Sequence, residues 1–231
     1  MRKTSTLTLL VVCLAQIVHA QISKGSLFLG GSIGYSHNSN EMEYNPSGNT
    51  VQDNKNTTWS FQPQIGKAVA ANQIVGVFLN FSKTSGSQQS GLNRLLNETT
   101  GNGGGIFYRR YHGLSNRLYL FGDAALGANF TRQQTNNDNG TINYASFKNK
   151  NTAINLSITP GLSFAASRKV YLEASLNSLL AIGYSWGNSH TYDVRGTVQQ
   201  TQNQKSFSAG ANANATSGLS VGLRWILPSK S

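Results

Sequence analysis

Eight segments of the chain alternate apolar and polar residues with a period of two, the pattern of a β-strand whose two faces meet different surroundings. In one of them, Trp59, Phe61 and Ile65 alternate with serine and glutamine. The segments are 26–36, 58–66, 74–82, 105–113, 117–131, 153–165, 169–186 and 207–227. No stretch shows the 3.6-residue apolar repeat of an amphipathic helix. The pattern therefore predicts an all-β fold.

The connections between these segments alternate strictly between short and long. The short ones are "AVAAN", "LSN" and "ASR", whereas the long ones, rich in Asn, Gln, Ser, Thr and Gly, cover 37–57, 83–103, 132–151 and 187–205. Long structureless loops are uncommon in a compact soluble domain. Short turns at one end and long loops at the other are typical of outer-membrane barrels. We therefore predict a closed antiparallel up-and-down transmembrane β-barrel of eight strands, with short periplasmic turns and four long extracellular loops.

The last two segments are longer than a strand needs to be to cross a membrane. Either their hairpin projects outward, or "SLNSL" and "NATSG" contain turns and the barrel has ten strands; the unbroken alternation favours the projecting hairpin. Pro63 and Pro160 lie in mid-strand, where proline removes a ladder donor that a closed barrel needs. We expect bulges or non-bonded ladder positions at both prolines.

Aromatic residues are sorted by strand end. If the strands alternate in direction, most of them lie near the outer rim, and Phe164 and Trp225 lie near the inner rim. Such positions suit rings that sit half in lipid headgroups. The predicted aromatic girdle consists of Tyr35, Trp59, Phe81, Phe130, Phe164, Tyr184, Trp186 and Trp225.

The first twenty residues have the features of a secretory signal peptide, with Arg2 and Lys3 before an apolar stretch and small residues before Gln21. We expect cleavage after Ala20, which leaves one domain over 21–231. Cys13 is the only cysteine and would be removed, so the mature chain could form neither a disulfide nor a thiolate metal site. No cofactor is expected.

The chain is strongly basic, with a formal net charge of +11. For an exported protein this suggests an anionic neighbour, with lipid headgroups or lipopolysaccharide more plausible than nucleic acid. No nucleic-acid-binding motif occurs in the sequence, and we expect a monomer.

Three stretches carry a resemblance to a known family: "QPQIGKAVAANQIVGVFLNFS", "GIFYRRYHGLSNRLYLFGDAALGANF" and "SVGLRWIL". They resemble the small outer-membrane β-barrel family that includes OmpA-barrel and OmpX-like, porin-like proteins, over essentially the whole mature chain. The resemblance implies a Gram-negative outer-membrane location. It also implies that Ser220, Gly222, Trp225 and Leu227 form a C-terminal signal for the barrel-assembly machinery, although Pro228 to Ser231 follow where the family usually ends on an aromatic residue.

An eight-stranded barrel has an interior just wide enough for side chains. The alternation points Arg109, Asp123, Glu173 and Arg224 into it. Because buried charges need partners, we predict a structural network of ion pairs that plugs the lumen. The alternative is a narrow, porin-like pore lined by the same charges.

Two other functions are weighed against a structural role. Some eight-stranded barrels modify lipid A, and His37 and Ser39, with Glu41 or Glu43, would be the candidate residues here; His112 and His190 have no convincing partners. The acid lies in the same loop as the histidine and serine, so we expect no enzyme. Binding of an unknown surface ligand through the long loops is the third class.

Overall fold

The computed structural model describes residues 22–44, 50–90, 93–138, 143–176, 179–193, 195–211 and 219–228. The predicted signal peptide and its cleavage site lie outside these ranges. The strands are β1 (Leu27–Tyr44), β2 (Thr50–Ala70), β3 (Gln73–Ser90), β4 (Asn93–Gly113), β5 (Leu118–Asp138), β6 (Asn143–Ala165), β7 (Val170–Leu176), β8 (Leu180–Tyr192), β9 (Val198–Ala211) and β10 (Leu219–Leu227). Among the described residues, no helix is long and apolar enough to span a membrane.

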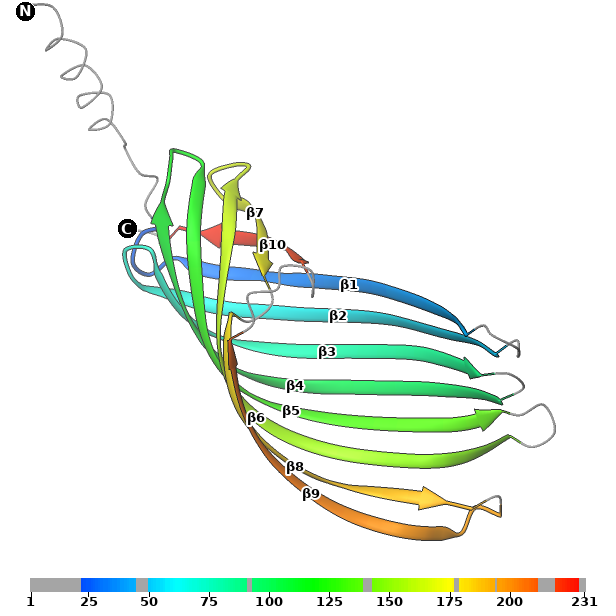
Figure 1. Ribbon diagram of the computed structural model, residues 1–231. Coiled ribbons are helices and arrows are strands. Elements are labelled where there is room, and N and C mark those ends of the chain that lie inside the picture. Colours follow the sequence, from blue (N-terminus) through cyan, green and yellow to red (C-terminus); the bar gives the residue numbers. More distant parts are fainter. Residues whose placement is uncertain are drawn as a thin grey trace, which may run out of the picture.

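The strands form one antiparallel sheet that closes on itself (Figure 1). Strands β1 to β6 pair each with the next, β6 pairs with β7, and β7 pairs with β10. The ring closes where β10 pairs with β1, with Leu27 opposite Leu227 and Gly34 opposite Ser220. This confirms the predicted closed, antiparallel, up-and-down β-barrel with eight strands in the ring.

The seventh and eighth predicted strands are each broken in two. β7 gives way to β8 across 177–179, and both lie along the same edge of β6, with Ser175 opposite Gly161 and Leu180 opposite Ile158. The eighth is divided into β9 and β10. The sheet therefore has ten strand segments but eight in the ring, and the hairpin of β8 and β9 projects along β6 beyond the closed part, as the alternation favoured.

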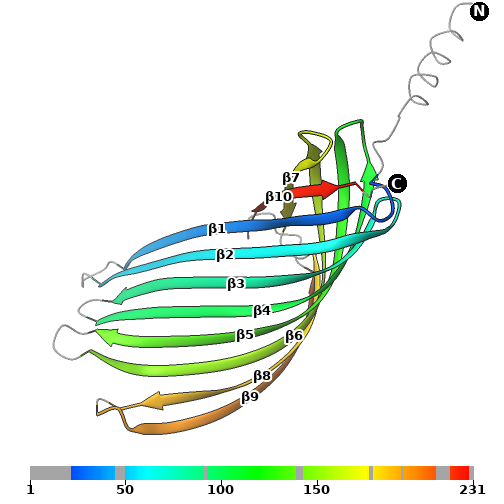
Figure 2. The ribbon, with the colours of Figure 1, turned by 180° about the vertical axis from the view of Figure 1, so that it is seen from behind.

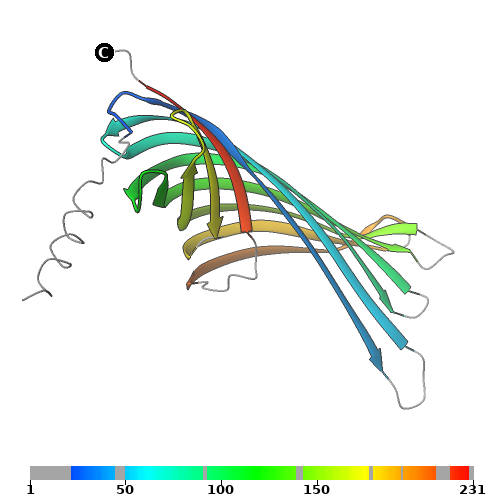
Figure 3. The same ribbon diagram turned by 90° about the horizontal axis from the view of Figure 1, so that it is seen from above.

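Beyond the closed part the sheet is open. Among the described residues, β1 pairs only with β2 from Tyr35 to Tyr44, and β9 pairs only with β8. Figure 3 shows β10 (red) along β1 (blue), whereas β9 (brown to orange) runs apart from both. The molecule is thus a ring at the end with short turns and a curved open sheet at the other end.

The four long connections differ from the structureless loops that the sequence predicted. Most of their described residues continue the flanking strands, and the extended strands pair with each other in antiparallel ladders (Figure 2). Polar cross-strand contacts join these extensions, such as Thr135 Oγ1 to Asn97 Oδ1 at 2.6 Å. A strand that is polar on both faces has no apolar alternation, so the pattern could not reveal it. We call the strand segments within 37–57, 83–103, 132–151 and 187–205 the polar half, and the remaining strand residues the apolar half.

The two mid-strand prolines lie at interruptions of the ladder, not at bulges. Pairing between β2 and β3 lapses at Gln62 and Pro63 and resumes in the same register. Pro160 lies between Ile158, the last β6 residue that pairs with β8, and Gly161, the first that pairs with β7. At Pro160 a missing donor costs little because the neighbouring edge changes there from β8 to β7. At Pro63 the neighbouring strand β3 is continuous, and only its pairing with β2 lapses.

The apolar half is built with its apolar residues on the outside. Exposed leucine, isoleucine, valine and aromatic side chains cover the outward face of every ring strand, with Ile33, Val77 and Ile106 each more than half exposed. The buried core is a smaller cluster inside the ring: Ile22, Phe28, Ala68, Ile74, Phe78, Phe107, Tyr111, Tyr119, Phe121, Ala165, Tyr171 and Ile226.

The segment before β1 seals the end of the ring that carries the short turns. Ile22 is buried in the core, and its backbone exchanges two hydrogen bonds with Asn72 in the turn between β2 and β3. The Ile22 N–H donates to the Asn72 side-chain oxygen at 2.9 Å, and the Asn72 N–H donates to the Ile22 carbonyl at 3.0 Å. Asn72 has a φ of 59°, a left-handed conformation that asparagine tolerates better than most residues.

Candidate functional site

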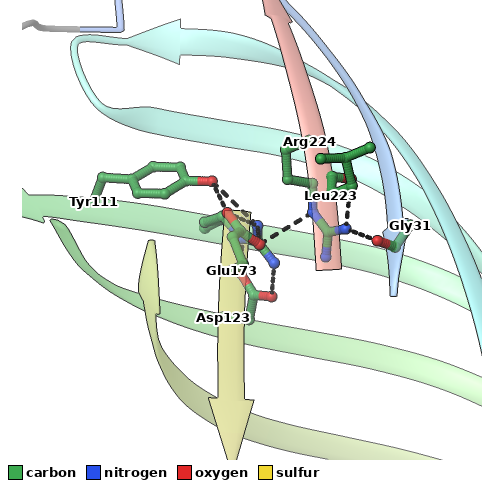
Figure 4. Close-up of polar contacts among 7 residues, drawn as sticks. Gly31, Tyr111, Asp123, Glu173, Leu223 and Arg224 are labelled. Atoms are coloured by element: carbon green, nitrogen blue, oxygen red, sulfur yellow. Dashed lines mark hydrogen bonds and ion pairs between the residues drawn. The ribbon is translucent and has the colours of Figure 1, made fainter. Parts of the chain in front are cut away.

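Four charged side chains meet inside the ring near its short-turn end (Figure 4). They come from four strands: Arg109 from β4, Asp123 from β5, Glu173 from β7 and Arg224 from β10. Each points inward because it alternates along its strand with neighbours that are less buried. The structure thus brings together all four residues of the predicted lumenal network, which we call the charge cluster.

Arg109 binds both carboxylates of the cluster. Its Nε and Nη2 donate to the two oxygens of Asp123, each at 2.5 Å, in the bidentate geometry that favours arginine over lysine. Its Nη1 donates to Glu173 Oε2 at 2.7 Å. Asp123 lies directly opposite Arg109 in the β4–β5 ladder.

Glu173 joins Arg109 to Arg224. Its Oε2 lies 3.1 Å from Arg224 Nε, and its Oε1 accepts a hydrogen bond from the Tyr111 hydroxyl at 2.6 Å. The guanidinium of Arg224 also donates to the carbonyl of Gly31 on β1. Two cations and two anions balance, and all four side chains are buried. Each charge has an opposite charge within 3.1 Å, although Arg224 Nε forms no hydrogen bond with a described residue.

Aromatic rings surround the cluster. The guanidinium carbon of Arg109 lies 4.3 Å from the ring centroid of Phe121 and 5.1 Å from that of Phe28, with Phe107 and Tyr111 slightly farther away. Sequence reasoning missed these inward aromatics. The available signal was the spacing of Phe107, Arg109 and Tyr111, which places all three on one face, but the opposite face of 105–113 is also partly apolar and hid it.

Two glycines leave room for Arg224. A β-carbon at Gly30 on β1 would collide with the Arg224 side chain and the Leu223 carbonyl, and one at Gly222 would lie 2.8 Å from Arg224 Nη1. Gly222 belongs to the predicted C-terminal assembly signal. Independently of that prediction, its lack of a side chain makes room for the Arg224 guanidinium. Of the other residues of that signal, Ser220 lines the interior, and Trp225 and Leu227 face outward.

Three residues of the charge cluster, Arg109, Asp123 and Arg224, form the floor of a cavity of about 660 Å³ that lies inside the sheet. Serine, threonine, asparagine and glutamine dominate its walls, including Ser60, Gln64, Asn80 and Asn129. Asn80 donates to Asn129 at 2.7 Å, whereas Asn80 Oδ1 and Gln64 Oε1 are buried without a protein partner. The interior is therefore a polar cup above a layer packed with charged and aromatic groups.

All eight residues of the predicted aromatic girdle face outward and are exposed. Phe81, Phe130 and Trp186 lie on one row of paired residues that crosses the sheet, and Tyr35 contacts Trp59 edge to face at 4.8 Å in the next row. Phe164 pairs with Leu118 and Trp225 with Leu29, toward the end with short turns.

The residues considered for enzymatic chemistry are not brought into a triad. His37 Nδ1 lies 3.0 Å from Thr57 Oγ1, and His190 makes the same contact with Thr201. Ser39 and Glu41 lie opposite Lys55 and Asp53 across the β1–β2 ladder. The side chain of Glu43 lies outside the described residues, and His112 is exposed on β4. Within the described ranges, no group of three or more His, Cys, Asp or Glu residues could hold a metal ion.

No family model and no curated protein matches this chain. Solved structures that resemble it include Neisserial surface protein A (15% identity, 87% of this chain and 96% of that one, TM-score 0.30). They also include the ferric yersiniabactin uptake receptor FyuA of Yersinia pestis (10% identity, 86% and 32%, TM-score 0.37). A third is the translocator domain of the autotransporter NalP of Neisseria meningitidis (11% identity, 96% and 93%, TM-score 0.22).

Proposed function

We propose that this chain is an integral outer-membrane β-barrel protein of a Gram-negative bacterium, with a plugged lumen and a structural or surface-interaction role. The observation that carries the proposal is the reversed distribution of polarity. The closed ring is apolar outside and holds four buried charged groups inside. A water-soluble protein seldom exposes so much contiguous apolar surface, whereas a lipid-facing barrel requires it.

The orientation follows from the two ends of the sheet. Short turns belong to the periplasmic side of such barrels and long connections to the cell surface. The polar half would then extend outward from the membrane, where it could present a binding surface to a partner of unknown identity. Lipopolysaccharide would surround the outer aromatic row, and the barrel-assembly machinery would act during insertion.

The test has two parts. Cells that express the protein should release it only with detergent, and the folded protein should migrate differently on gels before and after heating. Recovery of a folded protein from the soluble fraction would contradict the proposal. Protease added to intact cells should cleave near Arg195, between β8 and β9, and cleavage only after the outer membrane is opened would contradict the orientation.

The second candidate is a narrow pore, because the 660 Å³ cavity reaches down to the charge cluster. Conductance in planar bilayers separates the two. The plugged barrel should give no stable steps, whereas regular steps in the wild-type protein would favour the pore.

Catalysis is not part of the proposal; the lipid A of cells with and without the protein should have the same mass spectrum, and an altered acylation pattern would contradict this.

A further inference from the structure

The outward face of the sheet carries a groove of about 810 Å³. The proposed function assigns no role to this groove. Five strands line it, namely β4, β5, β6, β8 and β9. Its outward side chains lie in two adjacent rows of paired residues. The first row is Asn102, Phe130, Thr152, Trp186 and Lys205, and the second is Thr100, Arg132, Lys150, Asn188 and Asn203.

The groove begins where the apolar band of the barrel ends. Next to the first row, on its side nearer the short turns, the outward residues are Ile154, Tyr184 and Phe207. The following row in the same direction holds Leu126, Leu156 and Ile182. All six are exposed. Phe130 and Trp186 therefore mark the boundary between a surface that suits acyl chains and a surface that suits polar groups.

Three cations line the groove: Arg132, Lys150 and Lys205. None of the described residues that line the groove is acidic. Within the described ranges, none of the three cations forms an ion pair. Other outward cations nearby are engaged. Lys83 lies 2.7 Å from Glu98, and Lys148 lies 5.0 Å from the ring centroid of Tyr192. The groove thus combines positive charge without counter-charge with aromatic rings at the edge of an apolar face.

From this complementarity we infer that the groove binds a phosphorylated lipid of the surrounding leaflet. Its phosphate groups would contact Arg132, Lys150 and Lys205, and its acyl chains would lie along the apolar rows below. The inference rests on the proposed membrane location. It adds a defined site and ligand class to the general expectation of an anionic neighbour.

The test follows the fluorescence of Trp186, which lies in the groove. The chain has three tryptophans, so Trp59→Phe and Trp225→Phe leave Trp186 as the only reporter. Diphosphoryl lipid A titrated into micelles that contain the folded protein should change this fluorescence saturably. Arg132→Gln, Lys150→Gln and Lys205→Gln together should raise the apparent Kd about tenfold or more, since each cation near an anionic lipid surface contributes to binding.

A matched control removes three cations outside the groove: Lys55→Gln, Lys83→Gln and Lys148→Gln. This control has the same net charge as the groove variant and should bind within about twofold of the wild type. Equal losses in both variants, or no loss in the groove variant, would overturn the inference. Saturation by inorganic phosphate alone at a similar affinity would also overturn it, because the site would then recognise a free anion and not a lipid.

Failure of this inference can be distinguished from failure of the proposed function. Membrane extraction and heat-dependent gel mobility are measured on the same groove variant. A variant that inserts, shows the mobility shift and binds lipid A as tightly as the wild type contradicts only the groove. A wild-type chain that does not insert contradicts both.

Discussion

The apolar half and the polar half of this molecule share the same strands but are stabilised in different ways. In the apolar half, buried aromatic residues and a balanced cluster of charges fill the interior of the ring. In the polar half, Ser189 is the one buried residue among those whose side chains are described. There the sheet is held by backbone ladders and by exposed polar pairs such as His37 with Thr57.

The difference teaches that one strand can pass from a packed environment to a solvated one without changing its register. β5 runs from Leu118 to Asp138 and pairs with β4 without a shift along its whole length. The energetic consequences of a substitution should therefore depend on the half in which it lies. Glu173→Gln and Asp193→Asn test this contrast between the halves, and substitutions at Gly30 and Asn72 test how tightly the ring is packed and closed.

The largest effect is expected for Glu173→Gln. Arg224 then loses the carboxylate with which it pairs among the described residues, and the buried cluster carries a net positive charge. This should lower the free energy of unfolding by about 3–5 kcal/mol. Unfolding by urea in lipid vesicles, followed by gel mobility without heating, measures the change. Glu98→Gln removes the exposed partner of Lys83 in the polar half and should cost less than about 1 kcal/mol. Equal stability of the two variants would contradict the contrast.

Gly30→Ala should come second. The added methyl group would collide with Arg224 and with the Leu223 carbonyl at the closing ladder, and crowding of this kind costs about 1–3 kcal/mol. Gly210→Ala in β9 has no atom within 4 Å of its β-carbon and serves as the control. The same urea titration applies. A Gly210→Ala variant that loses as much stability as Gly30→Ala would show that the closing ladder is no tighter than the open edge.

Asn72→Gly should have a smaller effect of about 1 kcal/mol. Glycine accepts the left-handed backbone but loses the side-chain oxygen that receives the Ile22 N–H. Asn72→Ala loses the same hydrogen bond and also meets the left-handed strain, so it should be less stable than Asn72→Gly by a further 1 kcal/mol or so. Stability of Asn72→Ala equal to that of Asn72→Gly would mean that the backbone conformation at this turn does not matter.

The smallest effect is expected at the polar turn between β8 and β9, where the pKa of Asp193 is lowered. Its carboxylate accepts hydrogen bonds from the backbone N–H of Thr197, from the Gln199 side chain and from the backbone N–H of Arg195. A lowered pKa means that this stabilisation is present above the ordinary aspartate value and is lost as the pH falls below it. Amide exchange at Thr197 and Arg195, corrected for intrinsic rates, should therefore lose protection below about pH 4. In Asp193→Asn this pH dependence should be absent; its persistence would assign the effect to another group.

Much of the apolar half could be predicted from the sequence, because its two faces differ. The alternation that points Leu118, Leu120 and Leu126 outward also points Asp123 inward, so both the exposed apolar surface and the charge cluster could be found. The cavity floor was harder to anticipate, since the contact of Arg109 with Phe28 joins β4 to β1, which are far apart in sequence. Alternation gives the face of a residue but not its level in the ring.

The polar half could not be predicted in the same way. Segments such as 132–138 are polar on both faces, so they have the composition of a loop although they form a strand. The groove was missed for a related reason. Arg132 and Lys150 lie in one of the segments expected to be loops, and Lys205 lies at the edge of another. Only the register of the sheet places the three together.

The pairing of Leu27 with Leu227 has a consequence for the order of folding. The other ladders join segments that are neighbours or near neighbours along the chain, whereas the β1–β10 ladder joins the two ends of the described sequence. Contacts at large sequence separation carry the largest loop-closure entropy and form slowly. The hairpins are therefore expected to assemble before the ring closes, so the last and slowest step of folding would be the one that encloses the buried charges.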